Sequence, residues 1–300
     1  MSIKVAGIQA GPYPGSYEEN MKLCNEALDN VVKKEQPYIV AFSELMTAPY
    51  FGPMKSDMNV GGIDPDSFFD YAETKDGPTV TTLTRRAKEL NTHIIGTFME
   101  KAVENGATNY YNSACLLSPT KGLVGIYRKV HLPKIHTETF GTDEKYYFEK
   151  FGGAGKEFPV FELDNGTKIG ILICFDRSFP EAYRSLLVKG AQIVFVLVAT
   201  WGFRSETFLK ELEVRAMENQ FYIVEVNKAG DEQNEGEREA RDHFGKSAII
   251  HPSGKIIKQI ENEQWGHIAE EIDLKEIEKV TQVINFKNER KPQAYADILA

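Results

Sequence analysis

Three residues that can take part in covalent catalysis each end an apolar run typical of a buried strand. Glu44 ends "YIVAFSE", Lys129 ends "GLVGIYRK" and Cys174 ends "IGILIC". In α/β sheets, functional sites gather beyond the carboxyl ends of strands. Each residue alone has an ordinary explanation: Cys174 as an inert buried thiol, Glu44 as a loop cap and Lys129 as a solvated lysine. Their shared position predicts that they form one site.

The residue types define the chemistry of this predicted site. A thiol is a nucleophile only as the thiolate, so it needs a base or a positive environment. We expect Glu44, a carboxylate buried enough to accept a proton, to deprotonate Cys174, and Lys129 to align the two and stabilise an oxyanion. The backbone N–H of Phe175 would be a second oxyanion donor. Such a trio suits acyl transfer at an amide or nitrile carbon.

Alternating strands and helices must position these residues. Period-2 and period-3.6 patterns predict strands at 3–10, 38–44, 92–100, 168–174, 191–200 and 221–229, and helices at 16–35, 77–91, 180–189 and 205–220. Hairpins are predicted at 110–130 and 246–257, the second with a strand at 266–272 beside it. With no linker or repeat, we expect one α/β domain over residues 1–300, with 275–300 as a C-terminal tail.

Composition narrows the function further. The 300 residues are 42% hydrophobic and 26% charged, with a net charge of -9, which argues against a nucleic-acid surface. We find no secretory signal and no apolar run of about 18 residues, so we expect a cytoplasmic protein without a membrane span. Cys24, Cys115 and Cys174 lack CxxC spacing, and the histidines lack metal spacing, so no disulfide or metal site is predicted. Cys24 and Cys115 should be packing residues.

The segments around the three residues resemble a known family. "FSEL" with Glu44, "YRKVHLP" with Lys129 and "ILICFDRSFPEAYR" with Cys174 are similar, in order and spacing, to motifs of the nitrilase superfamily of carbon–nitrogen hydrolases. The resemblance implies a four-layer αββα sandwich that forms a homodimer through its outer helices. It also implies that Cys174 is the nucleophile at a strand-to-helix elbow, and that no cofactor is needed.

Three more site residues follow from the resemblance. "DEKYYFEKF" is similar to a segment of N-carbamoyl-amino-acid amidohydrolases, which implies that Glu144 is a second glutamate near Lys129 rather than an exposed loop charge. His131 either contacts the substrate or is a core histidine bonded to the backbone. Arg177 would bind a substrate carboxylate, or else pair with Glu181 one helical turn away.

The predicted reaction is hydrolysis of an N-carbamoyl amino acid to amino acid, carbon dioxide and ammonia. Ser178 and Phe175 depart from the carbamoylase pattern, which usually has Arg and Asn there, so a β-ureidopropionase and an aliphatic or ω-amidase remain open. A cationic carbamoylputrescine would suit Arg177 poorly. From another class, an inactive binding or scaffold protein on this fold remains possible. The charged segment 229–245 is either a solvated loop or a rim over the pocket.

Overall fold

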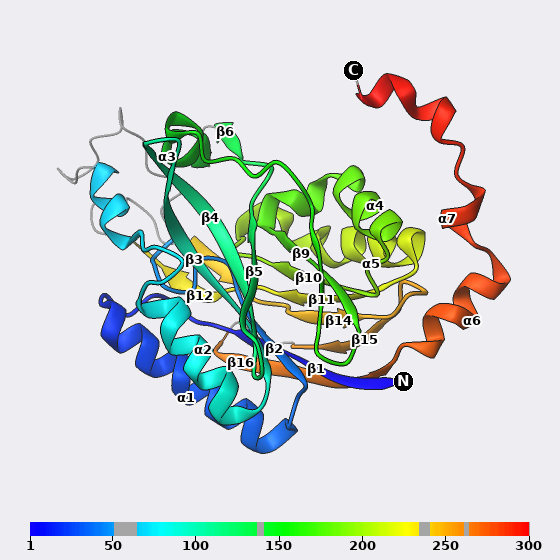
Figure 1. Cartoon of the computed structure of the whole chain (residues 1–300), viewed down its shortest axis with the longest axis horizontal. Helices are drawn as coiled ribbons and strands as arrows, with labels where there is room; N and C mark the ends of the chain where they lie inside the picture. The colour runs from blue at the N-terminus through cyan, green and yellow to red at the C-terminus, as the bar shows by residue number, and fades with distance from the viewer. Residues whose placement is uncertain (51–64, 137–140, 234–240, 261–263, 300) are drawn as a thin grey trace.

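Two six-stranded sheets form the centre of the protein, whose computed structural model describes residues 1–50, 65–136, 141–233, 241–260 and 264–299 (Figure 1). The first sheet has the order β16 (Gly266–Asp273), β1 (Ser2–Gln9), β2 (Ile39–Phe42), β3 (His93–Glu104), β4 (Ala107–Ser118) and β5 (Gly122–Arg128). The second has the order β15 (Ile256–Gln259), β14 (Ala248–Ile250), β11 (Tyr222–Val226), β10 (Ile193–Leu197), β9 (Lys168–Ile173) and β8 (Val160–Glu162).

Helices cover the outer face of each sheet. α1 (Tyr17–Glu35) and α2 (Pro78–Leu90) lie on the first sheet, and α4 (Pro180–Lys189) and α5 (Phe208–Asn219) on the second (Figure 1). α1, α2 and α4 begin where the sequence predicts: the Ser16 hydroxyl accepts the N–H of Glu19, and prolines open α2 and α4. α5 begins at Phe208 instead of 205, because the 3-10 helix η4 (Gly202–Glu206) precedes it. The predicted αββα sandwich is confirmed.

Apolar packing joins the four layers. One cluster of buried side chains lies between the sheets and beneath α4 and α5, and another lies between the first sheet and α1 and α2. The layers approach closely at two glycines, where a side chain would clash with the next layer. A Cβ on Gly7 would lie 2.5 Å from the side chain of Val226, and a Cβ on Gly170 would lie 2.7 Å from that of Leu186 in α4. Because these strands are buried on both faces, they read as continuous apolar runs.

The strand directions bring the predicted site residues to one edge. β1, β2 and β3 are parallel, as are β9, β10 and β11, while β4 and β5 run antiparallel to their neighbours. β5 therefore returns to the direction of β2. The carboxyl ends of β2, β5, β9 and β10 carry Glu44, Lys129, Cys174 and Thr200.

One strand pairing differs from the expectation. The predicted 266–272 strand exists as β16, but it pairs antiparallel with β1 in the first sheet, whereas the hairpin of β14 and β15 belongs to the second. Pairing between strands that are distant in the sequence is set by tertiary packing, so the local pattern could not identify β1 as the neighbour.

The C-terminal segment consists of α6 (Lys275–Val283), α7 (Phe286–Glu289) and a 3-10 helix η5 (Pro292–Leu299). It runs past the outer side of α4 and α5 and away from the sheets (Figure 1). The side chain of Gln220, at the end of α5, holds it by donating to the carbonyl of Ile284 (2.6 Å) and accepting the N–H of Phe286 (3.1 Å). Among helices of the described residues, none is long and apolar enough to cross a membrane.

Candidate active site

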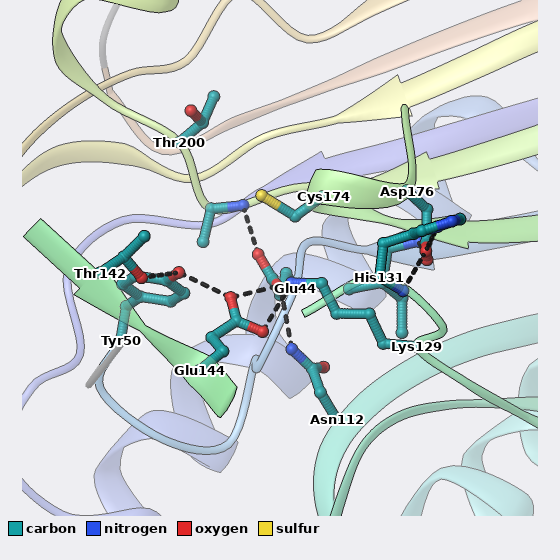
Figure 2. A network of polar contacts seen from close by, with 12 residues as sticks. Glu44, Tyr50, Asn112, Lys129, His131, Thr142, Glu144, Cys174, Asp176 and Thr200 are labelled. Atoms are coloured by element: carbon teal, nitrogen blue, oxygen red, sulfur yellow. Dashed lines mark hydrogen bonds and ion pairs between the residues drawn. The ribbon is translucent and has the colours of Figure 1, made fainter. Parts of the chain in front are cut away.

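Glu44, Lys129 and Glu144 meet in a buried charge cluster, with Cys174 next to the Glu44 carboxylate (Figure 2). The structure thus brings together the three predicted catalytic residues and Glu144. The polar side chains of the cluster are at most 1% exposed. Buried charges are costly unless they are paired, so the cluster must be judged by its hydrogen bonds.

Both oxygens of Glu44 are held. Oε1 accepts hydrogen bonds from Lys129 Nζ (2.7 Å) and Asn112 Nδ2 (2.8 Å), and Oε2 accepts the backbone N–H of Ala199 (3.0 Å). A carboxylate oxygen has two lone pairs, so Oε2 keeps one for a further proton. This oxygen can take the thiol proton of Cys174.

Lys129 is bound by both glutamates. Its Nζ donates to Glu44 Oε1 and to both oxygens of Glu144 (2.9 and 2.8 Å). Burial disfavours the ammonium, but the Glu144 and Glu44 charges outweigh it and raise the pKa of Lys129 above its usual range. These contacts engage all three Nζ protons, so stabilising an oxyanion requires Lys129 to give up part of its bond to Glu144.

Glu144 opens helix α3 (Glu144–Phe148) and also accepts a hydrogen bond from the hydroxyl of Tyr50 at 2.8 Å. Burial raises the pKa of Glu144 above its usual value, and the negative charge of Glu44 acts in the same direction. The Lys129 ammonium and the Tyr50 hydroxyl oppose this shift. The protonation state of Glu144 therefore depends on the hydrogen-bond donors that surround its carboxyl group.

Cys174 is the first residue of a short 3-10 helix, η3 (Cys174–Ser178), after β9. Its φ of 42° lies in the left-handed region, which a non-glycine residue adopts only at a cost of about 1–3 kcal/mol. Leu45, directly after Glu44, is also left-handed (φ 47°). Two of the strand ends at the site thus store backbone strain, which is typical of functional positions.

The Cys174 thiol is protonated at neutral pH. Burial, and after it the charge of Glu44, raise its pKa to about 12 against the opposing charges of Lys129 and Arg177. Cys24 and Cys115 also have pKa values raised to about 12 by burial, but they are 1% and 0% exposed, compared with 7% for Cys174. Cys24 packs in α1 and Cys115 in β4, as expected of core residues. Greater exposure, and Glu44 as the strongest influence on the thiol after burial, therefore distinguish Cys174.

Asp176 holds the turn that carries Cys174. Its Oδ1 accepts the backbone N–H of His131 (2.9 Å) and bonds the His131 ring at Nδ1 (2.8 Å). Its Oδ2 accepts the hydroxyl of Tyr127 (2.6 Å) and the N–H of Ile173 (3.1 Å). The His131 ring stacks on Phe179 at 3.6 Å. The ring of His131 thus bonds a side-chain carboxylate, where the sequence suggested substrate or backbone.

Arg177 lies in η3 and is buried, at 3% exposure, rather than opening α4 at a pocket mouth. Its ion-pair partner is Glu211 of α5, whose Oε2 lies 3.6 Å from Nε, and not Glu181, the partner that the alternative interpretation named. Nη1 donates to the carbonyl of Cys174 (3.0 Å) and lies 3.5 Å from its sulfur, and Nη2 lies 3.5 Å from the hydroxyl of Thr200. The Nη edge of the guanidinium therefore borders the thiol.

The charged segment 229–245 contains a hairpin of β12 (Ala229–Glu232) and β13 (Arg241–Phe244). Its buried side chains include Glu232, Arg241 and His243, so the described part is more than a solvated loop. His243 contacts the rings of Tyr50 and Trp201. Residues 234–240 lie outside the described part, so whether they form a rim stays a prediction.

Sequence reasoning missed three contributors to the cluster: Tyr50, Asn112 and Ala199. Asn112 carried a usable signal, because an amide in the apolar run "YYNSACLL" must find a partner when it is buried. Tyr50 and the N–H of Ala199 carried none. Within the described residues, no group of His, Cys, Asp and Glu is arranged to hold a metal.

Comparisons with known proteins point to one family. The family model described as carbon-nitrogen hydrolase matches residues 4–282. A probable nitrilase of Schizosaccharomyces pombe is 29% identical over 303 residues, covering 100% of both chains. An N-carbamoylputrescine amidase of Oryza sativa is 31% identical over 284 residues, covering 91% of this chain and 87% of the relative.

The fold is also found in solved structures. A carbon–nitrogen hydrolase from Helicobacter pylori superposes with a TM-score of 0.84 at 22% identity, over 100% of this chain and 99% of the other. At that identity the likeness establishes the fold, and the chemistry must be argued from the site itself.

Proposed function

Since the chain belongs to the carbon–nitrogen hydrolase family, we propose that it hydrolyses N-carbamoyl amino acids through a thioester at Cys174. The observation that carries this proposal is the Glu44 carboxylate, fixed by Lys129 and the Ala199 N–H beside a protonated thiol. Because such a thiol is inert without a base, the arrangement suits nucleophilic attack on an acyl carbon.

The proposed reaction begins when Glu44 takes the proton of Cys174 and the sulfur attacks the carbamoyl carbon. Lys129 and the N–H of Phe175 stabilise the resulting oxyanion. The C–N bond to the terminal amino group breaks, and Glu44 returns its proton to the departing ammonia. Glu44 then activates a water that hydrolyses the thioester, which restores the thiol and releases a carbamate. The carbamate decomposes to carbon dioxide and amino acid.

The position of Arg177 favours a substrate that carries a carboxylate. Its Nη edge borders the Cys174 sulfur and Thr200 through contacts of 3.5 Å, which a carboxylate could replace with shorter bidentate bonds. His131, 25% exposed beside the elbow, is the other proposed substrate contact. Free thiols at all three cysteines favour a reducing cytoplasm as the place of action.

A second candidate is suggested by the relatives named N-carbamoylputrescine amidase. N-carbamoylputrescine has the same carbamoyl group as the proposed substrate, but it carries a cationic amine in place of the carboxylate. Arg177 opposes such a substrate, although Glu211 partly balances its charge. A β-ureidopropionase or a simple amidase would also use the same cluster.

The test is ammonia release from N-carbamoyl-D-, L- and β-amino acids, N-carbamoylputrescine and simple aliphatic amides. Cys174→Ala should lose at least about 10³-fold in kcat, as expected when a nucleophile is removed. Cys24→Ala, which removes a thiol from α1, should keep its activity. Ordinary turnover by Cys174→Ala would refute the mechanism. A wild-type protein inactive on every compound would support the scaffold alternative.

Arg177→Ala tests the substrate class separately. A lost buried charged hydrogen bond costs about 2–5 kcal/mol, so KM for N-carbamoyl amino acids should rise by at least about 30-fold. A neutral amide should be nearly unaffected, and Arg177→Lys should recover only part of the loss. Equal losses on both substrates would show that Arg177 acts structurally, through Glu211.

A further inference from the structure

Another buried carboxylate, Glu232 at the end of β12, lies outside the charge cluster of Glu44, Lys129 and Glu144. It is 3% exposed. One oxygen accepts the backbone N–H of Tyr50 at 2.7 Å, and the other accepts the backbone N–H of Tyr13 at 3.0 Å. Glu232 thus ties together the segments that follow β1 and β2, which are far apart from β12 in the sequence.

Glu232 acts as a fixed anion. Burial alone would raise its pKa, but Lys228 (3.2 Å), His243 (3.9 Å) and Arg241 (3.8 Å) lower it to about 2. Burial lowers the pKa of His243 to about 3, so this ring stays neutral near pH 7. Neither side chain changes charge near pH 7, so Glu232 remains an acceptor for the Tyr50 N–H there.

Tyr50 carries this constraint into the site. Its ring is 2% exposed and packs edge-on against Trp201 at a centroid distance of 5.3 Å. Its hydroxyl donates to Glu144 Oε1 at 2.8 Å, the same oxygen that accepts a hydrogen bond from Lys129 Nζ (Figure 2). With the backbone held by Glu232 and the ring held by Trp201, the hydroxyl is aimed at Glu144.

We propose that Glu232 is a positioning residue, which holds Glu144 and thereby Lys129 in place through Tyr50. The inference rests on the proposed function in one respect, that Glu144 and Lys129 take part in the reaction. Before substrate binds, Glu144 must hold Lys129 in place. When the oxyanion forms, one hydrogen bond of Lys129 Nζ must pass from Glu144 to the oxyanion. A misplaced Tyr50 would leave Glu144 with one donor fewer, and its pKa would rise, because the carboxylate form loses a hydrogen bond.

The test is a double-mutant cycle with Glu232→Gln, Tyr50→Phe and the double variant. The amide of Glu232→Gln can accept only one of the two backbone N–H groups, whereas Tyr50→Phe removes only the hydroxyl. Each should lower kcat about tenfold, with KM changed less than about threefold. The acid limb of the kcat profile should move to higher pH in both, since Glu144 then protonates at higher pH. The double variant should be no slower than the slower single variant.

Glu73→Gln is the matched control. Glu73 also accepts a backbone N–H, that of Thr79 at 2.8 Å, but it contacts α2 and no residue of the cluster. It should lower the melting temperature without shifting the pH profile. If Glu232→Gln costs the same factor in the Tyr50→Phe background as in wild type, or leaves the acid limb unmoved, the inference is overturned.

Failure of the proposed function is distinguishable from failure of this inference. If no compound of the panel is hydrolysed, the rate of Cys174 alkylation by iodoacetamide at pH 7 replaces kcat. Tyr50→Phe and Glu232→Gln should then each change the alkylation rate by a similar factor. The double variant should change it no more than either single variant does. An alkylation rate equal to wild type in Tyr50→Phe and Glu232→Gln would overturn the inference independently of any substrate.

Discussion

The Cys174 proton decides whether the site can start a reaction. With the pKa of the thiol raised to about 12 by burial, thiolate is scarce near pH 7. The Glu44 carboxylate, with a free lone pair on Oε2, offers the proton a place within the site. Reactivity should therefore depend on Glu44 more than on the pH of the solution.

Glu44→Gln tests this dependence. In the wild type, transfer to Glu44 generates the nucleophile, so the alkylation rate of Cys174 should vary little between pH 7 and 9. In Glu44→Gln the thiol must ionise to solvent below its raised pKa, so the rate should be lower at pH 7, by about 10²-fold, and should climb about tenfold per pH unit. Mass spectrometry of the Cys174 peptide measures both.

Cys24 and Cys115 are internal controls in the same digest. They are less exposed than Cys174, so both should label after it, and activity should fall in proportion to Cys174 labelling. Prior labelling of either control thiol, or identical pH profiles for the two proteins, would contradict the assignment of Glu44 as base.

At the scale of elements, the elbow between β9 and α4 is held by one carboxylate. Asp176 receives four donors, from His131, Tyr127 and Ile173, and keeps Cys174 in its left-handed conformation. A buried donor that loses its acceptor retains its desolvation cost. Because Asp176 also binds the N–H of Ile173, the residue before Cys174, it helps to maintain the strained backbone at Cys174.

Asp176→Asn should lower the free energy of unfolding by about 2–4 kcal/mol, because the amide nitrogen that replaces one carboxylate oxygen is itself a donor and cannot accept the hydrogen bonds made to that oxygen. Urea denaturation measures the loss, and activity should fall with it. Asp164→Asn is the control: Asp164 also accepts two hydroxyls, of Ser118 and Thr120, but in a turn at 18% side-chain exposure. A smaller loss at Asp176 than at Asp164 would show that the elbow does not depend on this residue.

The sequence predicts most of these elements, because periodicity and strand ends are local properties. Glu44, Lys129 and Cys174 were recognisable since each ends an apolar run. The pairing of Arg177 with Glu211 and that of β16 with β1 could not be recognised from the sequence, because tertiary packing alone brings these partners together. Tyr50 and Glu232 were missed for the same reason: 182 positions separate them, and nothing local marks their contact.

At the scale of the whole molecule, the C-terminal segment leaves apolar side chains uncovered. Val283 is 86% exposed, Ile284 47% and Tyr295 40%. Between this segment and α4 lies a groove of about 740 Å³, lined by Val188, Phe286 and Pro292 among others. The side chains of Ile298 and Leu299 lie outside the described part. Such a surface is costly in water, so we propose that a second copy covers it.

Val188→Asp tests the homodimer proposed from the family resemblance. Val188 is 45% exposed on α4 and borders the groove, so a charge there should weaken association by at least about tenfold without unfolding the chain. Val103→Asp is the control, because Val103 is 72% exposed on β3, outside the residues that line the groove. Light scattering at micromolar concentration should show a dimer or larger assembly for wild type and Val103→Asp, and monomer for Val188→Asp. A monomeric wild type would refute the homodimer, and an unchanged assembly in Val188→Asp would place the interface elsewhere.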